Sequence, residues 1–322
     1  ASLAHRDSLV VMPTGGGKSL CYQVPPAVAD RTDVVISPLI SLMKDQVDGL
    51  IARGYPAAAL HSNLSPAERR KIESGMRENA FRLVFAAPER ALSSWFMSSM
   101  QAMNVQAIAI DEAHCISQWG HDFRPEYRQL AMLRDRFTKA SFHAFTATAT
   151  PRVQQDIVDQ LRLRDPARLI GRFDRPNLIY RILPKVNKIE QIVEVIRRHE
   201  KEAVIVYCIS RRDTEELANV LRANGINAAH YHAGMDAVDR RRTQEAFSNE
   251  SLDVVVATVA FGMGIDRSNV RCVIHESMPK TIEGYQQETG RAGRDGLEAE
   301  CVMLYAAGDA MRWEGLIATS AD

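Results

Sequence analysis

Short apolar runs alternate with longer amphipathic stretches from one end of the chain to the other. Apolar runs of this length, separated by helical segments, are typical of strands in a parallel sheet that is buried on both faces. In the first half we expect strands at 9–12, 34–37, 57–61, 83–86, 107–110 and 142–146. In the second half we expect them at 178–183, 204–207, 228–232, 254–258, 273–276 and 301–305. The pattern predicts an α/β protein.

The chain of 322 residues is too long for one compact core, so two domains are expected. The alternation breaks at Gly171–Asn177, where glycine, proline and charged residues follow one another, and then it restarts. This break predicts a first domain over residues 1–172 and a second over residues 173–322. In such sheets ligands bind beyond the carboxyl ends of the strands, so functional residues are expected there.

Composition excludes several classes of protein. The chain has no run of eighteen apolar residues, which argues against a membrane span, and its first residues do not resemble a signal peptide. Its five cysteines lie far apart and form no Cys-x-x-Cys pair, so neither a disulfide framework nor a zinc site is expected. These features favour a cytoplasmic protein without zinc.

The net charge of the chain is zero. There are 21 basic and 17 acidic residues as far as Arg172, and 19 basic and 23 acidic residues after it. A strongly basic footprint, common among nucleic-acid-binding proteins, is therefore missing. Composition alone does not indicate a nucleic-acid partner.

A glycine-rich segment follows the first expected strand. It comprises Pro13, Thr14, Gly15, Gly16, Gly17, Lys18 and Ser19, and a helix is expected from about Leu20. Glycines let backbone N–H groups surround phosphate oxygens, Lys18 supplies positive charge, and the Ser19 hydroxyl suits Mg²⁺. The strict pattern requires glycine where Met12 stands, and the alternative is a flexible turn. We interpret the segment as a phosphate-binding loop.

Two adjacent carboxylates follow the strand expected at 107–110. Asp111 is suited to hold Mg²⁺ that bridges the nucleotide, and Glu112 to orient or deprotonate a water molecule. The alternative is a pair of solvated acids at a helix N-terminus, which the helix dipole favours. The phosphate loop earlier in the chain favours the catalytic interpretation.

Two arginines near the end of the chain, Arg291 and Arg294, are spaced to share one face of a helix or turn. Planar guanidinium groups make paired contacts with phosphate oxygens, and an arginine finger accelerates phosphoryl transfer. The alternative is a solvated basic helix. These arginines are candidates for contacts with the γ-phosphate.

In this order, the segments resemble the motor core of superfamily 2 helicases and, more closely, of the RecQ family of DNA helicases. The most specific match is the run from Asp111 to Tyr127, which resembles a DEAH box continuing into an aromatic-rich loop. Further matches are 13–19, 37–46, 146–149, 173–177, 257–266 and 286–296. The resemblance covers nearly the whole chain and implies two tandem RecA-like domains with a nucleotide cleft between them.

The resemblance implies an ATP-dependent, DNA-stimulated DNA helicase that uses Mg²⁺. It implies 3′→5′ movement on single-stranded DNA and duplex unwinding in repair and recombination. By resemblance, Arg294 is the finger and Arg291 a second γ-phosphate contact, while His114 and Gln287 couple the nucleotide to the domain interface. Asp266 is placed near the ribose.

The aromatic-rich loop offers Trp119, Phe123 and Arg124 for stacking on the bases of a single strand. The alternative is that both aromatic rings fill the core, but the glycine and proline in this segment favour a surface loop. The loop is therefore the main candidate for contact with DNA.

Candidates for contact with the DNA backbone follow other strands. They are Ser37, Lys44 and Gln46 in the first domain, and Arg211 and Thr258 in the second. Each also suits a helix cap or turn. Because none reads base edges, we expect sequence-independent binding of single-stranded and partly duplex DNA, weakened by salt.

Two other functions are compatible with the motifs: an RNA-directed motor of the same superfamily, and a nucleic-acid-binding module that uses ATP only as a conformational ligand. Family members usually carry an adenine-recognition segment before the phosphate loop, and many continue into a four-cysteine zinc module and a winged helix. The sequence shows neither, so weaker adenine selectivity is expected. A monomer with no membrane association is also expected.

Overall fold

The computed structural model describes residues 1–120, 122–171, 174–259, 261 and 267–319. The chain divides into two compact units, Ala1–Phe173 and Asp174–Asp322, which we describe separately. Within the described residues, no helix is both long enough and apolar enough to cross a membrane.

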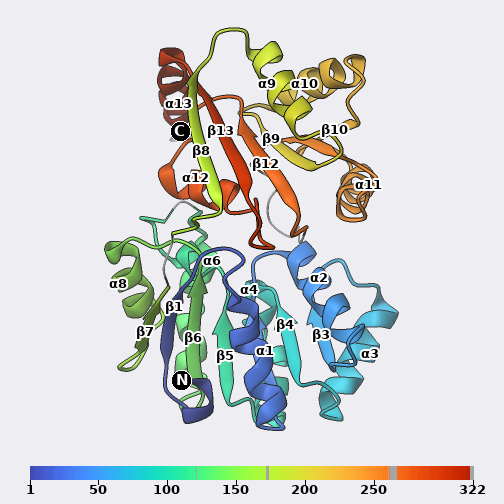
Figure 1. Ribbon diagram of the computed structural model, residues 1–322. Helices are drawn as coiled ribbons and strands as arrows, with labels where there is room; N and C mark the ends of the chain where they lie inside the picture. Colours follow the sequence, from blue (N-terminus) through green and yellow to red (C-terminus); the bar gives the residue numbers. More distant parts are fainter. Residues whose placement is uncertain (121, 172–173, 260, 262–266, 320–322) are drawn as a thin grey trace. The chain divides into compact units, whose positions relative to one another are not determined.

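The first unit is built on a parallel sheet of seven strands, in the order β3-β4-β2-β5-β6-β1-β7 (Figure 1). Its strands are β1 (Ser8–Val11), β2 (Asp33–Ile36), β3 (Ala57–Leu60), β4 (Leu83–Ala86), β5 (Ala107–Ile110), β6 (Ser141–Thr146) and β7 (Ala167–Ile170). Strands β5, β6 and β1 are neighbours in the sheet and run parallel, so their carboxyl ends lie side by side.

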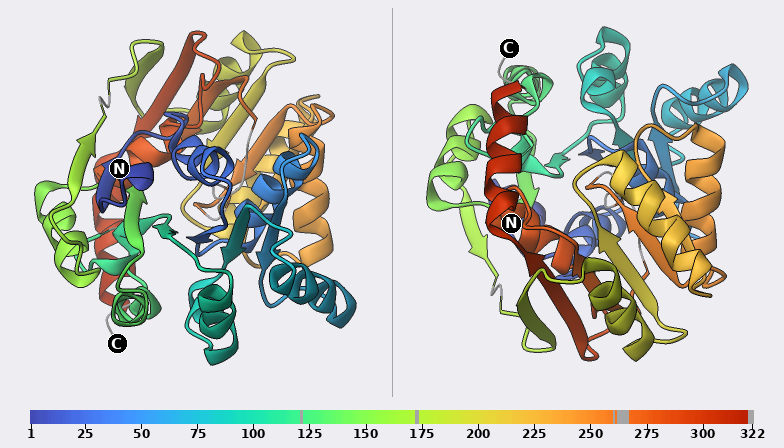
Figure 2. Two further views of the ribbon diagram at one scale, coloured as in Figure 1. Left: turned by 90° about the horizontal axis from the view of Figure 1, so that it is seen from below. Right: turned by 90° about the horizontal axis from the view of Figure 1, so that it is seen from above.

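Helices cover both faces of this sheet (Figure 2). They are η1 (Ser2–Ala4), α1 (Lys18–Val28), α2 (Ile40–Ile51), α3 (Pro66–Arg77), α4 (Pro88–Ala91), α5 (Ser94–Ala102), η2 (Ala113–Ile116), α6 (Pro125–Arg128), α7 (Ala131–Arg136) and α8 (Pro151–Gln160). Alternate residues of β2 enter different cores: Val34 and Ile36 pack on one face and Val35 on the other. This alternation follows from the pleat of a strand.

The second unit has a parallel sheet of six strands, in the order β10-β11-β9-β12-β13-β8. Its strands are β8 (Leu178–Pro184), β9 (Ala203–Tyr207), β10 (Ala228–Tyr231), β11 (Val254–Ala257), β12 (Val270–His275) and β13 (Ala299–Tyr305). Its helices are α9 (Lys188–Arg198), α10 (Arg211–Ala223), α11 (Ala237–Ser248), α12 (Ile282–Thr289) and α13 (Ala307–Thr319).

All twelve strands expected from the sequence are present, with ends that shift by at most a few residues. The prediction missed β7, which pairs with β1 at the edge of the first sheet. Its residues Arg168, Leu169 and Ile170 are exposed, so the strand lacks the buried apolar run on which the prediction relied. The two sheets confirm the predicted α/β architecture.

Candidate active site

The predicted phosphate loop connects β1 to α1 and has the shape that its glycines permit. Gly15 and Gly17 have φ values of 80° and 85°, in the left-handed region that favours glycine. A Cβ atom on Gly16 would lie 2.9 Å from the carbonyl oxygen of Pro13. Gly17 is also the N-cap of α1 and has no side chain to bond the first helical N–H groups. Unpaired N–H groups at a helix N-terminus are favourable partners for an anion.

Lys18 is the first residue of α1. Its Nζ donates to the carbonyl oxygens of Met12, at 3.0 Å, and Pro13, at 3.3 Å. The ammonium group is thus held over the loop, where a bound phosphate would meet it. Ser19 follows in the first turn of the same helix.

The two predicted carboxylates follow the carboxyl end of β5. The phosphate loop follows the carboxyl end of β1, so both lie on the same side of the sheet. Asp111 is 4% exposed, and its carboxylate accepts a hydrogen bond from the backbone N–H of Glu112 at 3.0 Å. Burial raises the pKa of Asp111, the charge of Glu112 raises it further, and Lys18 opposes the shift. A buried carboxylate at the carboxyl end of a strand next to a phosphate-binding loop is a favourable position for a divalent cation. The residues on this side of the sheet therefore fit Mg²⁺.

Asp111 is fixed through its backbone. Its N–H donates to the carbonyl oxygen of Ile36 at 2.8 Å. The hydroxyl of the fully buried Tyr127 donates to its carbonyl oxygen at 3.1 Å. The next residue, Glu112, has a φ of 47°, so the chain turns sharply and the two carboxylates diverge.

A chain of contacts leads from Glu112 into β6. Glu112 Oε2 lies 3.4 Å from Nδ1 of the buried His114, which lies 2.9 Å from Oγ1 of Thr146. The Thr146 hydroxyl donates its one proton to the carbonyl oxygen of Thr148 at 3.0 Å, so its oxygen accepts from His114. The His114 ring is therefore hydrogen-bonded to Thr146 and lies beside the Glu112 carboxylate.

The segment after η2 folds back on the same residues. The backbone N–H of Arg124 donates to the carbonyl oxygen of Cys115 at 2.8 Å. A Cβ atom on Gly120 would lie 2.6 Å from the carbonyl oxygen of His114, so only glycine allows this approach. The loop is thereby packed against the element that carries Glu112 and His114.

The aromatic side chains of this loop are exposed rather than in the core. Trp119 is 52% exposed and Phe123 39% exposed, as expected of a surface loop. Cations cover both rings: the Arg152 guanidinium lies 3.4 Å from the Trp119 ring centroid, and that of Arg128 lies 5.1 Å from the Phe123 centroid. Arg124 is held by Asp122 at 3.0 Å.

Sequence reasoning missed Arg152 and Arg128. Arg152 is the second residue of α8. It comes three residues after the end of the matched 146–149 segment, and a positive charge so close to that segment is a signal that could have drawn attention to it.

The other candidates for contact with DNA lie in different environments. Lys44 is exposed on α2, Thr258 is half-buried after β11, and Arg211 is exposed as the first residue of α10. Ser37 is only 1% exposed, so its hydroxyl offers no accessible surface to a phosphate in this structure. Gln46 accepts a hydrogen bond from Tyr22 at 2.9 Å and is engaged within the first unit.

In the second unit, the predicted arginines follow α12 rather than extending it, because the helix ends at Thr289. Arg291 is 6% exposed and Arg294 half-buried, and the charges of both act on the buried Tyr207. Burial raises the pKa of Tyr207 to about 12, and Arg291 opposes that shift. Gln287 lies half-buried on α12.

Both arginines are therefore part of the folded unit, not of a solvated basic helix. Asp266, expected near the ribose, lies outside the described residues.

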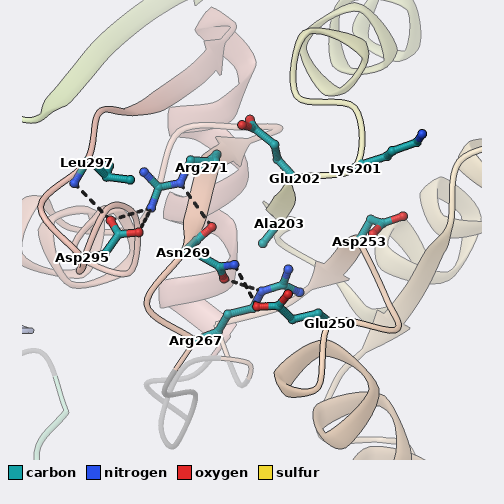
Figure 3. A pocket seen from close by; sticks show the side chains of 10 residues that line it. All are labelled: Lys201, Glu202, Ala203, Glu250, Asp253, Arg267, Asn269, Arg271, Asp295 and Leu297. Atoms are coloured by element: carbon teal, nitrogen blue, oxygen red, sulfur yellow. Dashed lines mark hydrogen bonds and ion pairs between the residues drawn. The ribbon is translucent and has the colours of Figure 1, made fainter.

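A separate hollow of about 280 Å³ lies in the second unit (Figure 3). This hollow lies at the amino ends of the strands. Its lining includes Ala203 of β9, Asp253 just before β11 and Arg271 of β12. Arg271 is paired there with Asp295 at 2.6 Å. Because ligands of parallel sheets bind at the carboxyl ends, this hollow is not the candidate site.

Two family models match the chain. Residues 1–157 match the DEAD/DEAH box helicase model, and residues 185–296 match the helicase conserved C-terminal domain.

Curated relatives match almost the whole chain. It is 47% identical over 309 residues to the ATP-dependent DNA helicase RecQ of Pasteurella multocida, covering 96% of this chain and 49% of the relative. It is 46% identical to the protein of that name from Bacillus subtilis, covering 98% of this chain and 54% of the relative. The chain is 42% identical to the ATP-dependent DNA helicase Q-like 2 of Arabidopsis thaliana. That alignment covers 98% of this chain and 47% of the relative. The chain thus spans about half the length of these relatives.

Solved structures share the fold. A DNA-bound structure of the DUF1998 helicase MrfA aligns with a TM-score of 0.76 at 19% identity, covering 98% of this chain and 49% of that one. The Mycobacterium smegmatis helicase Lhr aligns with a TM-score of 0.71 at 21% identity. The alignment covers 94% of this chain and 44% of that one. At these identities the likeness establishes the fold, two RecA-like parallel-sheet domains.

Proposed function

Because this chain belongs to the RecQ family of DNA helicases, we propose that it is an ATP-driven motor that moves along single-stranded DNA. The observation that carries the proposal is the continuous chain of contacts at the end of β5. It connects Glu112, through His114, to Thr146 on one side and to the exposed aromatic loop on the other. Binding of DNA to the aromatic loop would thus be coupled, through a few contacts, to activation of the attacking water by Glu112.

The nucleotide is proposed to bind through its phosphates. The N–H groups of Gly15 and Gly17 and the ammonium group of Lys18 would hold the β- and γ-phosphates, while the N–H of Gly16 donates to the carbonyl oxygen of Pro13 at 3.0 Å and closes the loop. Thr14 contributes to the same loop. Ser19 and Asp111 would hold Mg²⁺, which when bound supplies charge neutralisation and Lewis acidity at the phosphate oxygens.

The chemical step is proposed to depend on Glu112 and on the arginines after α12. Glu112 would orient the attacking water, and the His114 ring, whose Nδ1 proton goes to Thr146, would lie beside its carboxylate at 3.4 Å. Arg294 would stabilise the charge that develops on the γ-phosphate, with Arg291 as a second contact and Gln287 as a coupling residue. The burial of Arg291 and the partial burial of Arg294 support defined positions for both side chains.

Single-stranded DNA is proposed to stack on Trp119 and Phe123, displacing the arginines that cover these rings. Lys44, Arg211 and Thr258 would contact phosphates without reading sequence. By family membership we further propose 3′→5′ movement and unwinding of partly duplex DNA in repair and recombination.

The test is ATP hydrolysis with and without single-stranded DNA, and with RNA of equal length. We expect DNA to stimulate hydrolysis more than RNA does. Trp119→Ala should lose stimulation and keep the basal rate, and Glu112→Gln should lose both. Met132→Ala is the matched control, because Met132 is an exposed apolar residue of the same unit outside the loop. Stronger stimulation by RNA would support the RNA-directed motor, and an unchanged basal rate in Glu112→Gln would support a module that only binds ATP.

A further inference from the structure

Three side chains with metal-binding atoms meet at one edge of the second sheet. They are Glu215 of α10, His230 of the edge strand β10, and His232, which follows that strand. One ligand atom from each lies within 4.8 Å of the other two. None of these residues has a role in the proposed motor.

The local fold explains this meeting. Residues two apart on a strand project to the same face, and the rings of His230 and His232 lie nearly parallel, at 19°, with centroids 5.5 Å apart. The buried Thr214 and Ala218 of α10 fix the adjacent Glu215 beside this strand. Glu215 Oε1 lies 2.8 Å from Nε2 of His232.

The three residues differ in freedom of movement. His232 is 4% exposed, so its ring is fixed by packing, whereas His230 and Glu215 reach the surface. Burial lowers the pKa of His230, and the neighbouring His232 and Arg222 lower it further, against the opposing charges of Glu215 and Asp239. A neutral imidazole is the form that binds metal.

We propose that Glu215, His230 and His232 bind one divalent transition-metal ion of the zinc class, with the remaining position open to water. Two imidazole nitrogens and one carboxylate oxygen form a donor set that suits Zn²⁺ and not Mg²⁺, which prefers oxygen ligands alone. Zinc–nitrogen bonds are about 2.0–2.1 Å long, so the two surface side chains would move towards the fixed His232. The ion would fasten α10 to β10.

Two other groups of metal-binding side chains are weaker candidates. His114, Cys115 and Asp122 form one group, and His199, Cys272 and Glu300 the other. In each, burial raises the pKa of the cysteine thiol, which opposes formation of the thiolate that binds metal.

The carboxylates of these two groups are also engaged. Asp122 is paired with Arg124 at 3.0 Å, and Glu300 with Arg198 at 3.0 Å. A metal ion would have to displace a guanidinium group in both.

The experiment is a titration of the chelator-treated protein with Co²⁺, followed by visible absorption, and with Zn²⁺, followed by calorimetry, both in excess Mg²⁺. We expect one ion per chain. Glu215→Gln and His230→Ala should each weaken binding about tenfold or more. Glu216→Gln is the matched control, because Glu216 is the next residue of α10 and pairs with Arg212 at 2.6 Å. Its affinity should equal that of the unchanged protein.

The presence of cysteine in the other two groups makes the readout specific. Co²⁺ bound to a thiolate absorbs strongly in the near ultraviolet, whereas Co²⁺ bound to the proposed nitrogen and oxygen ligands does not. A thiolate band, an absence of Co²⁺ binding, or an unchanged affinity in His230→Ala would overturn the proposal. Circular dichroism checks the fold of each variant, and His230→Asn replaces His230→Ala if the latter unfolds.

Discussion

At the scale of single residues, Gly120 illustrates how closely the aromatic loop packs against η2, which follows the proposed catalytic residue Glu112. The atom that blocks a Cβ here is the backbone carbonyl oxygen of His114, at 2.6 Å, and backbone cannot rotate away as a side chain can. The turn is also closed by the N–H of Gly120, which donates to the carbonyl oxygen of Ser117 at 3.0 Å. The loop can reach its position only without a side chain at residue 120.

Gly120→Ala should therefore shift the loop away from His114. We expect a loss of about 1–3 kcal/mol in the free energy of unfolding, the usual cost of forcing an added methyl into a packed site. We also expect DNA stimulation of ATP hydrolysis to fall more than the basal rate. Denaturant unfolding and hydrolysis assays measure both. Gly308→Ala is the control, because a Cβ there meets nothing within 4 Å, and equal effects of the two variants would contradict the argument.

At the scale of secondary-structure elements, β6 links the buried core to the site. Its carboxyl end carries Thr146, and its middle carries His143, whose ring lies between two serines of the sheet. Ser8 Oγ lies 2.8 Å from Nδ1 and Ser141 Oγ lies 2.9 Å from Nε2. One serine hydroxyl can accept from the protonated ring nitrogen and the other can donate to the unprotonated one. These hydrogen bonds therefore suit a neutral imidazole.

Burial lowers the pKa of His143 to about 4, from an ordinary value near 6.5. The unfolded chain then binds the proton more readily, so the first unit should be most stable above about pH 6.5 and lose stability towards pH 4. The loss attributable to this residue should be at most about 3 kcal/mol. Urea unfolding at several pH values measures it. His143→Gln should show a flatter profile, and an equally steep one would assign the pH dependence to other groups.

At the scale of the whole molecule, the residues proposed to bind and hydrolyse ATP come from both units. The phosphate loop and the carboxylates that fit Mg²⁺ belong to the first, and Arg291 and Arg294 belong to the second. Binding of ATP and its hydrolysis should therefore respond to different substitutions.

Lys18→Ala should lose ATP binding and hydrolysis together, because the proposed contact of the ammonium group with the phosphates would be present both in the bound state and in the transition state. If Arg294 is the proposed finger, Arg294→Ala should keep ATP binding and lose roughly a thousandfold in rate, as arginine fingers do in other phosphoryl-transfer enzymes. Fluorescent-nucleotide binding and single-turnover hydrolysis separate the two effects. Arg212→Ala, at a side chain 85% exposed, serves as the control. Hydrolysis at the normal rate in Arg294→Ala would show that this arginine does not contact the reacting phosphate.

The amino-acid sequence by itself determined the architecture and the composition of the candidate site. Buried strands need continuous apolar runs, so the strands that end at Val11, Ile110 and Thr146 were predictable from local pattern. The same holds for the loop before Lys18, because the motif and its strand–loop–helix context are contiguous in the chain. Even the exposure of Trp119 followed from nearby glycine and proline residues.

Only the tertiary structure decided what depends on residues far apart in the chain. The edge strand β7 forms because β1 offers it hydrogen bonds, not because its own side chains are buried. Ser37 is covered, Arg152 reaches the Trp119 ring, and Glu215 meets two histidines that no sequence spacing connects with it. Such contacts are set by how helices pack on a sheet, and local periodicity carries no information about that packing.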